Sequence, residues 1–268
     1  MENNKIKKLI KESVLKLINN TTADTKIEKI IGKHEVKTHF MPIRYRIFGG
    51  LLQSLNIQFG NFIEVLLQEI IATETYLEIV KTISNKKKVS LSLTKETDAL
   101  IDRFISDRQN NNDNQLPKKF EYLLKNIVVT QHSDMDLMTA KHDVDVLFKD
   151  KRNEVYYYLE VKYDDNHDTG KFADINRKFI KTYAGLVKKL EIKDAKRLKP
   201  ILYYLTRKVM KGNIYIPEET HIYRGAKLFN ELLTTKYDDL DRCLQNFSEN
   251  TETVELFDNL YKKIRYGK

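Results

Sequence analysis

The sequence predicts an α/β protein with a mixed central sheet in the order α-β-β-β-α-β, flanked by helices and preceded by a helical N-terminal region. Three observations support this fold class. Two short apolar runs, residues 144–148 and 155–161, flank a charged break and therefore predict a β-hairpin. Apolar side chains recur at helical spacing before and after the hairpin. The apolar segment 200–206 suits a strand in the middle of a sheet that helices cover.

The N-terminal part of the chain is expected to be mainly helical. Apolar positions at helical spacing predict helices over residues 5–18, the first part of 27–40, 59–80 and 94–105. Gly49 and Gly50 are expected to break the chain before the third of these helices. Thr94 is expected to cap the fourth.

The C-terminal part is expected to contain the sheet. Asp168 or Thr169 can cap the helix that follows the hairpin. The other predicted elements are a helix over 117–125, strands over 127–130, 200–206, 214–216 and 221–223, a helix from Arg224 to about 247, and a helix over 254–264. We expect one domain over residues 1–268, with a mainly helical part (1–115) followed by the sheet and the C-terminal helices (116–268).

Charge and cysteine content narrow the class of protein. The chain has 268 residues and a net charge of +9, with 32% charged residues, so a basic excess lies over a mixed acidic background. Nucleic acid is the leading partner for such a surface, and a generically basic soluble protein is the alternative. Cys243 is the only cysteine, which excludes an intrachain disulfide. No apolar run is long enough to span a membrane and no signal-peptide core is present, so a cytoplasmic location is expected.

The predicted hairpin fixes which side chains share a face. A symmetric hairpin around residues 149–154 pairs residues whose numbers sum to 303 (148 + 155), and side chains alternate between faces. Asp143 is then directly opposite Glu160, with Asp145 one diagonal step away. This face also carries Leu147, Tyr156, Tyr158 and Lys162. The opposite face is almost wholly apolar and is expected to be core: Val144, Val146, Phe148, Val155, Tyr157, Leu159 and Val161.

The acidic face predicts metal-dependent chemistry. Carboxylates a few ångströms apart stay ionised at low cost only when a cation lies among them. Oxygen ligands from two neighbouring strands suit Mg²⁺, which is usually held by one or two carboxylates together with a substrate phosphate. Lys162 lies two residues after Glu160 on the same face, where it can hold or deprotonate a water aimed at phosphorus. These residue types together indicate phosphodiester hydrolysis.

Three segments resemble known nucleases. Asp145 followed by Glu160-Val161-Lys162 resembles the D…ExK signature of the PD-(D/E)xK nuclease superfamily, although no proline precedes the aspartate. Asp168-Thr169-Gly170-Lys171 is similar to the DT-x-K element of many type II restriction endonucleases. Residues 48–64 resemble the HinfI-type restriction endonucleases.

The resemblance implies a restriction-endonuclease-like fold and a Mg²⁺-dependent endonuclease that cuts double-stranded DNA at a short palindrome, such as GANTC. Asp145 and Glu160 would ligate the metal and Lys162 would position the water. Asp143 and Glu64 would support them as further ligands, Glu64 from the helix before the sheet. Asp145 is preferred to Asp143 because the apolar run that follows it matches the superfamily strand. A homodimer and a companion DNA methyltransferase are also implied.

Five residues are candidate DNA contacts. Thr169 and Lys171 belong to the DT-x-K element, and Lys171 begins a helix face that holds several cations. Arg44 and Arg46 flank an aromatic residue and could contact phosphate or lie in a solvated loop. Arg224 could read a base or hold a phosphate, and a structural turn explains it equally well.

Two other functions remain open from the sequence. One is a DNA repair or junction-resolving nuclease on the same core, although the residues ahead of the hairpin favour extra recognition structure. The other is a non-catalytic DNA-binding protein, in which Asp143, Asp145, Glu160 and Lys162 form a structural ion-pair cluster.

Overall fold

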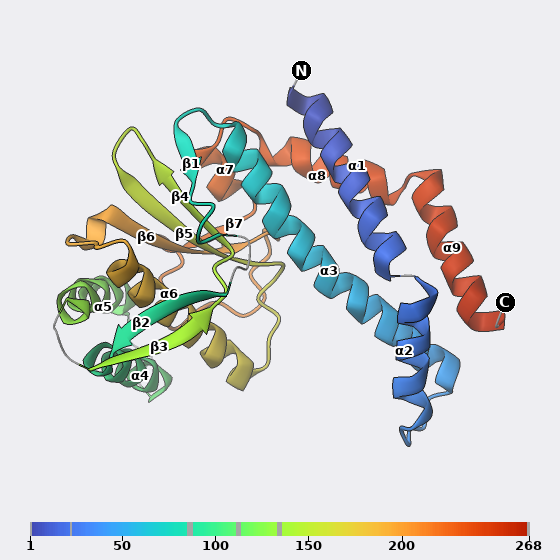
Figure 1. Cartoon of the computed structure of the whole chain (residues 1–268), viewed down its shortest axis with the longest axis horizontal. Coiled ribbons are helices and arrows are strands. Elements are labelled where there is room, and N and C mark those ends of the chain that lie inside the picture. The colour runs from blue at the N-terminus through green and yellow to red at the C-terminus, as the bar shows by residue number, and fades with distance from the viewer. Residues whose placement is uncertain (1, 22, 85–87, 111–113, 133–135, 267–268) are drawn as a thin grey trace. The chain divides into compact units, whose positions relative to one another are not determined.

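The chain forms two compact units (Figure 1). The computed structural model describes residues 2–21, 23–84, 88–110, 114–132 and 136–266. Unit 1 comprises Met1–Ile70 and Thr235–Lys268, and unit 2 comprises Ile71–Thr234. Among the described residues, no helix is both long and apolar enough to cross a membrane.

Unit 1 is helical. Its helices are α1 (Glu2–Thr21), α2 (Asp24–Glu35), α3 (Ile43–Thr73, in this unit as far as Ile70), α8 (Tyr237–Ser248) and α9 (Thr251–Tyr266). Ile27 of α2, Leu51 of α3 and Leu260 of α9 share one buried core. The C-terminal helix therefore packs with helices from the beginning of the chain. The predicted helices over 5–18, the first part of 27–40 and 254–264 are confirmed, with shifted ends.

The predicted break at Gly49 and Gly50 is wrong, because α3 runs through both residues. A Cβ atom on Gly50 would lie 2.9 Å from His34 Nε2 and 3.2 Å from Ile30 Cγ2, both on α2. Gly50 therefore lets two helices approach each other closely and does not end either one. Gly49 has no atom within 4 Å of the same position.

Unit 2 contains the mixed sheet. Its five strands lie in the order β1 (Leu77–Ile79), β4 (Val146–Asp150), β5 (Val155–Lys162), β6 (Leu198–Tyr204) and β7 (Ile222–Arg224). The β1–β4 and β4–β5 pairs are antiparallel, and the β5–β6 and β6–β7 pairs are parallel. With α3 before β1 and α6 (Thr169–Lys189) between β5 and β6, the order α-β-β-β-α-β is confirmed.

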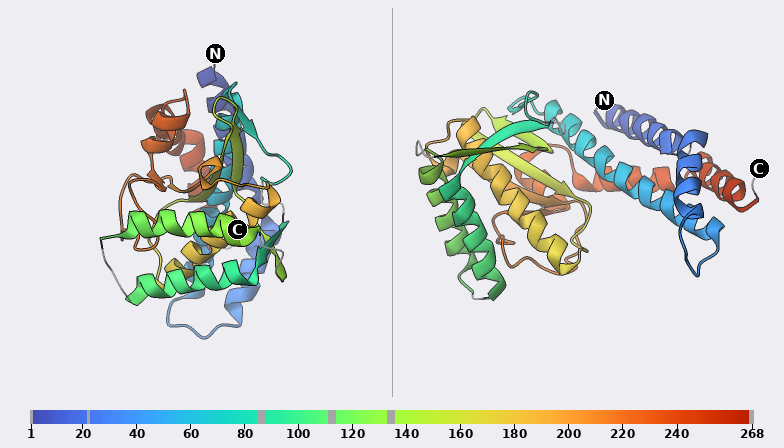
Figure 2. Two further views of the ribbon diagram at one scale, coloured as in Figure 1. Left: turned by 90° about the vertical axis from the view of Figure 1, so that its left-hand side faces the viewer. Right: turned by 60° about the horizontal axis from the view of Figure 1, so that its bottom comes forward.

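A long insertion separates β1 from β4. It contains β2 (Val89–Thr94), α4 (Lys95–Asn110), α5 (Leu116–Gln131) and β3 (Leu137–His142). β2 and β3 form a separate antiparallel ribbon, in which the hydroxyls of Ser92 and Thr139 lie 2.9 Å apart. α4, α5 and α6 lie side by side (Figures 1 and 2). Thr94 caps α4 through a hydrogen bond from Thr97 N to its Oγ1, as the sequence predicts.

The strand predicted over 127–130 is wrong, because these residues belong to α5. Ile127 and Val128 extend a buried helical stripe that begins with Phe120, Leu123 and Leu124. Burial of this stripe outweighs the preference of β-branched residues for strands. β1 provides the first strand of the core in their place.

Two further expectations for the C-terminal part are wrong. Residues 214–216 form a turn, in which Asn213 Oδ1 accepts hydrogen bonds from the N–H groups of Tyr215 and Ile216. The single helix expected after Arg224 is two helices, α7 (Ala226–Leu232) and α8. α7 is followed by a tight link in which Glu74 Oε1 accepts hydrogen bonds from the N–H and hydroxyl of Thr234.

Candidate active site

The hairpin of β4 and β5 is paired two residues away from the predicted register. Val146 pairs with Leu159, so paired residue numbers sum to 305 (146 + 159). The parity, and with it the division into two faces, is as predicted. Asp145 precedes Val146 and is therefore level with Glu160, the place that the sequence assigned to Asp143. A hydrogen bond of 2.8 Å from Val161 N to Asp145 Oδ2 holds the aspartate there.

A tight turn explains the shifted register. Arg152 donates to both carboxylate oxygens of Asp150, at 2.9 Å from Nε to Oδ1 and 2.7 Å from Nη2 to Oδ2. Asn153 Oδ1 accepts a hydrogen bond from Val155 N, and Glu154 has a φ of 62°. These local contacts close the turn in four residues, so the strand ladder extends to the Asp150–Val155 pair.

Asp145, Glu160 and Lys162 form one cluster at the end of the hairpin. Asp145 is 4% exposed and Glu160 is 3% exposed. Lys162 Nζ lies 2.7 Å from Glu160 Oε1, 3.1 Å from the carbonyl oxygen of Val161 and 4.0 Å from Asp145 Oδ2. The ammonium group is thus surrounded by two carboxylates and one main-chain oxygen.

The oxygen atoms around Lys162 are of the kind that hard divalent cations bind. Among the residues that the structure describes, no group of three or more His, Cys, Asp or Glu side chains is placed to hold a metal. Asp145, Glu160 and the Val161 carbonyl are the candidate protein ligands because their oxygen atoms lie together around Lys162 Nζ. Two carboxylates suit the coordination of Mg²⁺, which usually keeps several water ligands.

Tyr158 is a further member of the cluster. Its hydroxyl donates a hydrogen bond of 2.8 Å to Glu160 Oε2. Burial alone would raise the pKa of Glu160, but the nearby charges of Lys162 and Lys178, with the hydrogen bonds from Lys162 and Tyr158, hold it below the usual value. Burial and the charge of Glu160 raise the pKa of Tyr158 well above its usual value, so this hydroxyl stays a donor.

A second polar contact lies next to this cluster. His142, at the end of β3, has its Nδ1 3.0 Å from Thr182 Oγ1 of α6. Burial and the charge of Lys178 lower the pKa of His142, which keeps the imidazole neutral near pH 7.

The parity of the strand placed Tyr158 on the acidic face, but sequence analysis did not predict its hydrogen bond to Glu160. Nothing in the spacing of the sequence brings Thr182 to His142.

Comparison with known proteins identifies the family. The family model described as "Type II restriction endonuclease, HinfI" matches residues 2–248. The type II restriction enzyme HinfI of Haemophilus influenzae is 45% identical over 262 residues, which cover 98% of this chain and 98% of that enzyme. The chain belongs to the HinfI family of type II restriction endonucleases. No solved structure matches it.

Membership of the HinfI family identifies the activity as site-specific cleavage of DNA. Its members are site-specific deoxyribonucleases, so the partner of this chain is DNA. Type II restriction endonucleases generally need a divalent metal ion, and the two buried carboxylates described above provide ligands suited to one.

The two predicted supporting acids belong to different units of the chain. Asp143 is half-buried ahead of β4, and within the described parts of the chain no hydrogen bond or ion pair joins its carboxylate to Asp145, Glu160 or Lys162. Glu64 is buried in the part of α3 that belongs to unit 1. Their roles as ligands in this HinfI-family chain stay predictions.

The predicted DNA contacts of unit 2 differ in their surroundings. Thr169 and Lys171 lie exposed in the first turn of α6, where Asp168 caps the helix by accepting a hydrogen bond of 2.8 Å from Lys171 N. Arg224 is half-buried, and its guanidinium donates to Glu218 and to Asp165. The structure thus gives Arg224 partners within the chain, as the structural-turn alternative expects.

The predicted contacts of unit 1 also differ. Arg46 Nη1 donates to the carbonyl oxygens of His34 and Lys37, at 3.0 and 2.9 Å, and so ties the end of α2 to α3. Arg44 is exposed, with its guanidinium 5.3 Å from the centre of the Tyr45 ring. Arg44 is therefore the more accessible of the two cations.

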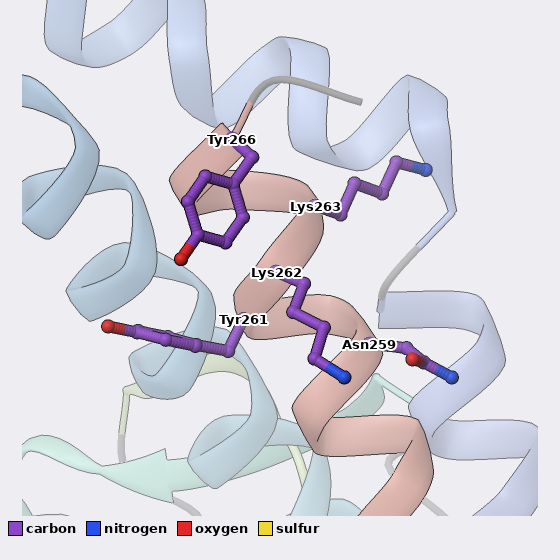
Figure 3. A pocket seen from close by; sticks show the side chains of 5 residues that line it. All are labelled: Asn259, Tyr261, Lys262, Lys263 and Tyr266. Atoms are coloured by element: carbon purple, nitrogen blue, oxygen red, sulfur yellow. The ribbon is translucent and has the colours of Figure 1, made fainter.

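A separate hollow lies on α9 in unit 1 (Figure 3). Its volume is about 780 Å³, and it is lined by Asn259, Tyr261, Lys262, Lys263 and Tyr266. The two tyrosine rings project to the same side of the helix (Figure 3). Among the described residues that line this hollow, none has a carboxylate, so the hollow offers no such ligand to a divalent metal ion.

Proposed function

We propose that this chain hydrolyses one phosphodiester bond in each strand of a short palindromic DNA site in a Mg²⁺-dependent reaction. Asp145 and Glu160 would hold the metal and Lys162 would act on the nucleophilic water. The observation that supports this most is the position of Lys162 Nζ among three oxygen atoms, from Glu160, Val161 and Asp145. A cation already occupies the space between two carboxylates that would otherwise repel each other.

The protein residues fit a hard divalent ion. The two carboxylates and the Val161 carbonyl are all oxygen donors, and Glu160 is held in its charged form by its neighbours. A bound Mg²⁺ would act as a Lewis acid toward the phosphate and make a bound water more acidic.

The side chains of the cluster would hold the water, offset negative charge and keep the carboxylates in place. Lys162 has three N–H donors, so it can hold a water while it bonds Glu160, and its charge offsets the negative charge that develops on the phosphate. Tyr158 fixes the second oxygen of Glu160. The N–H of Val161 fixes Asp145. Hydrogen bonds within the protein thus fix both carboxylates.

The recognition sequence and the oligomeric state are proposed from the similarity to HinfI. HinfI acts at GANTC, and with 45% identity over nearly the whole length we propose the same palindrome for this chain. A palindrome has two-fold symmetry, so a homodimer would present one catalytic cluster to each strand. A companion methyltransferase would protect the cell's own sites, and the reaction would take place in the cytoplasm, where that DNA lies.

A plasmid assay tests this function. With Mg²⁺, the wild type is expected to give discrete bands whose sequenced ends map to GANTC sites. Glu160→Ala and Lys162→Ala are each expected to abolish cutting while binding of the duplex in Ca²⁺ stays within a few-fold of wild type. Lys149→Ala is a matched control, because Lys149 lies on the same hairpin, pairs with Glu154 and has a side chain 25% exposed, against 24% for Lys162.

Three outcomes would contradict the proposal. If Lys162→Ala cuts at the wild-type rate, the chemistry assigned to Lys162 is wrong. Cutting of branched DNA alone would indicate a junction-resolving enzyme. A gel shift without cleavage by the wild type in Mg²⁺ would indicate a DNA-binding protein.

A further inference from the structure

A basic loop, residues 206–212, leaves the sheet beside the catalytic cluster. β5 and β6 are parallel, so their C-terminal ends meet at one edge of the sheet, where ligands of α/β proteins usually bind. Leu205 N donates a hydrogen bond of 2.9 Å to the carbonyl oxygen of Lys162, and Thr206 N donates one of 3.1 Å to that of Tyr163. The basic loop therefore begins next to Lys162.

The main chain of the basic loop is held by two charged residues, the buried Asp165 and the half-buried Arg224. Asp165, which is 1% exposed, accepts hydrogen bonds from Met210 N at 2.8 Å and from Lys211 N at 3.4 Å. Arg224 donates from Nη2 to Asp165 Oδ2 at 3.0 Å and from Nη1 to the carbonyl oxygen of Lys208 at 3.4 Å. These contacts fix the position of the loop through its backbone.

The side chains at the centre of the loop are exposed. Val209 is 54% exposed and Met210 is 46% exposed, although apolar, and Lys208 is also exposed. Within the described residues, the ammonium group of Lys208 has no hydrogen bond or ion pair. Arg207 and Lys211 add two more cations, and the loop contains no acid. A basic segment with exposed apolar side chains is thus held through its backbone at the sheet edge that carries Lys162.

We propose that the basic loop contacts the DNA duplex next to the bond that is cut, with Lys208 on a backbone phosphate and Val209 and Met210 against base edges. This inference rests on the proposed nuclease function. Phosphate contacts set the register of a protein on DNA, and apolar contacts with base edges, such as the thymine methyl group, carry sequence information. Asp165 is a positioning residue, since it acts through the loop.

The phosphate contact is tested by salt dependence. For Lys208→Ala, the slope of log Kd for the cognate duplex in Ca²⁺ against log salt concentration is expected to be smaller by about one, because one phosphate contact is lost. Lys193→Ala is the matched control: Lys193 is exposed beyond the far end of α6, a helix of 21 residues. This control should keep the wild-type slope.

The base contact is tested by specificity. For Val209→Ser with Met210→Ser, the ratio of kcat/KM for the cognate site to that for sites with one changed base pair is expected to fall about 10-fold. Val129→Ser, at an exposed valine of α5, should leave the ratio unchanged. Asp165→Ala should lower the same ratio, and Asp165→Glu should restore part of it, which a general loss of stability would not do.

The inference is overturned if Lys208→Ala keeps the wild-type slope, or if the double variant keeps the wild-type specificity ratio while it remains folded by circular dichroism. Either result would leave the nuclease assignment intact, because the wild type would still cut. A wild type that never cuts DNA would overturn the proposed function itself, and this inference with it.

Discussion

At the scale of single residues, the hydrogen bond from Tyr158 to Glu160 gives the first prediction. Tyr158→Phe removes a donor to a buried carboxylate but keeps the ring, which stacks on Phe179 with 5.3 Å between ring centres. Hydrogen bonds to charged groups contribute about 1.5–3 kcal/mol, and part of this should be lost from the transition state. The single-turnover cleavage rate is therefore expected to fall about 10-fold.

Tyr183→Phe provides the control for that experiment. Tyr183 is also buried, on α6, but its hydroxyl has no hydrogen-bond partner within the described part of the chain. Its removal should leave the cleavage rate unchanged. A loss of rate equal to that of Tyr158→Phe would show that any buried hydroxyl matters and would refute a specific role for Tyr158.

His221 makes stability depend on pH. Burial lowers its pKa to about 4, and its ring lies 2.8 Å from the carbonyl oxygen of Pro200 and packs edge-on against Phe120. Between about pH 6.5 and pH 4 the unfolded chain binds a proton that the folded chain does not, so stability falls as pH falls. His221→Gln should lose less stability than the wild type between pH 7 and pH 5, by about 2 kcal/mol in urea titrations. Equal losses in the two proteins would contradict this.

The grouping of Asp145, Glu160 and Lys162 on one face could be predicted from the sequence because strand parity depends only on odd and even positions. A register shift of two residues leaves parity unchanged, so Asp145, Glu160 and Lys162 stayed on one face. The same shift exchanged Asp143 for Asp145 opposite Glu160. The register itself could not be predicted, because the hydrogen bonds from Arg152 to Asp150 that set the turn leave no trace in the alternation of apolar and polar residues.

At the scale of secondary-structure elements, replacing Gly185 of α6 and Gly49 of α3 by alanine is expected to change the stability of the protein in opposite directions. A Cβ atom on Gly185 of α6 would lie 2.6 Å from Leu91 Cβ, which is buried on β2. Gly185→Ala must therefore push α6 and β2 apart and is expected to cost about 1–3 kcal/mol. Gly49→Ala has open space inside α3 and should stabilise the protein by about 0.5–1 kcal/mol. Thermal and urea unfolding of both variants checks the two signs, and a stabilising Gly185→Ala would contradict the packing.

The elements that could be predicted from the sequence are those whose pattern is long. α1, α4, α6 and α9 each repeat an apolar stripe over several turns, and their existence was predicted correctly. β1 has three residues, too few for alternation to be visible. Residues 127–130 look like a strand in isolation, and only the stripe that begins with Phe120 reveals the helix.

At the scale of the whole molecule, the symmetry of the proposed site predicts a dimer. One chain has a mass of 31.7 kDa, so a dimer has a mass of about 63 kDa (2 × 31.7). Sedimentation with a cognate duplex in Ca²⁺ should show two chains on one duplex. A single chain on each duplex under saturating protein would refute the symmetric arrangement and would favour two sequential encounters.

A mixed dimer connects this symmetry to the chemistry of one residue. If each subunit cuts one strand, a dimer of one wild-type and one Lys162→Ala subunit, isolated through two different tags, should convert a supercoiled plasmid with one site to the open-circular form and stop there. The mixed dimer with Lys149→Ala should proceed to the linear form, because Lys149 pairs with Glu154 at the far end of the hairpin. Linear product from the Lys162→Ala mixture at the wild-type rate would mean that a single cluster cuts both strands, and a two-fold symmetric dimer would then have no catalytic purpose.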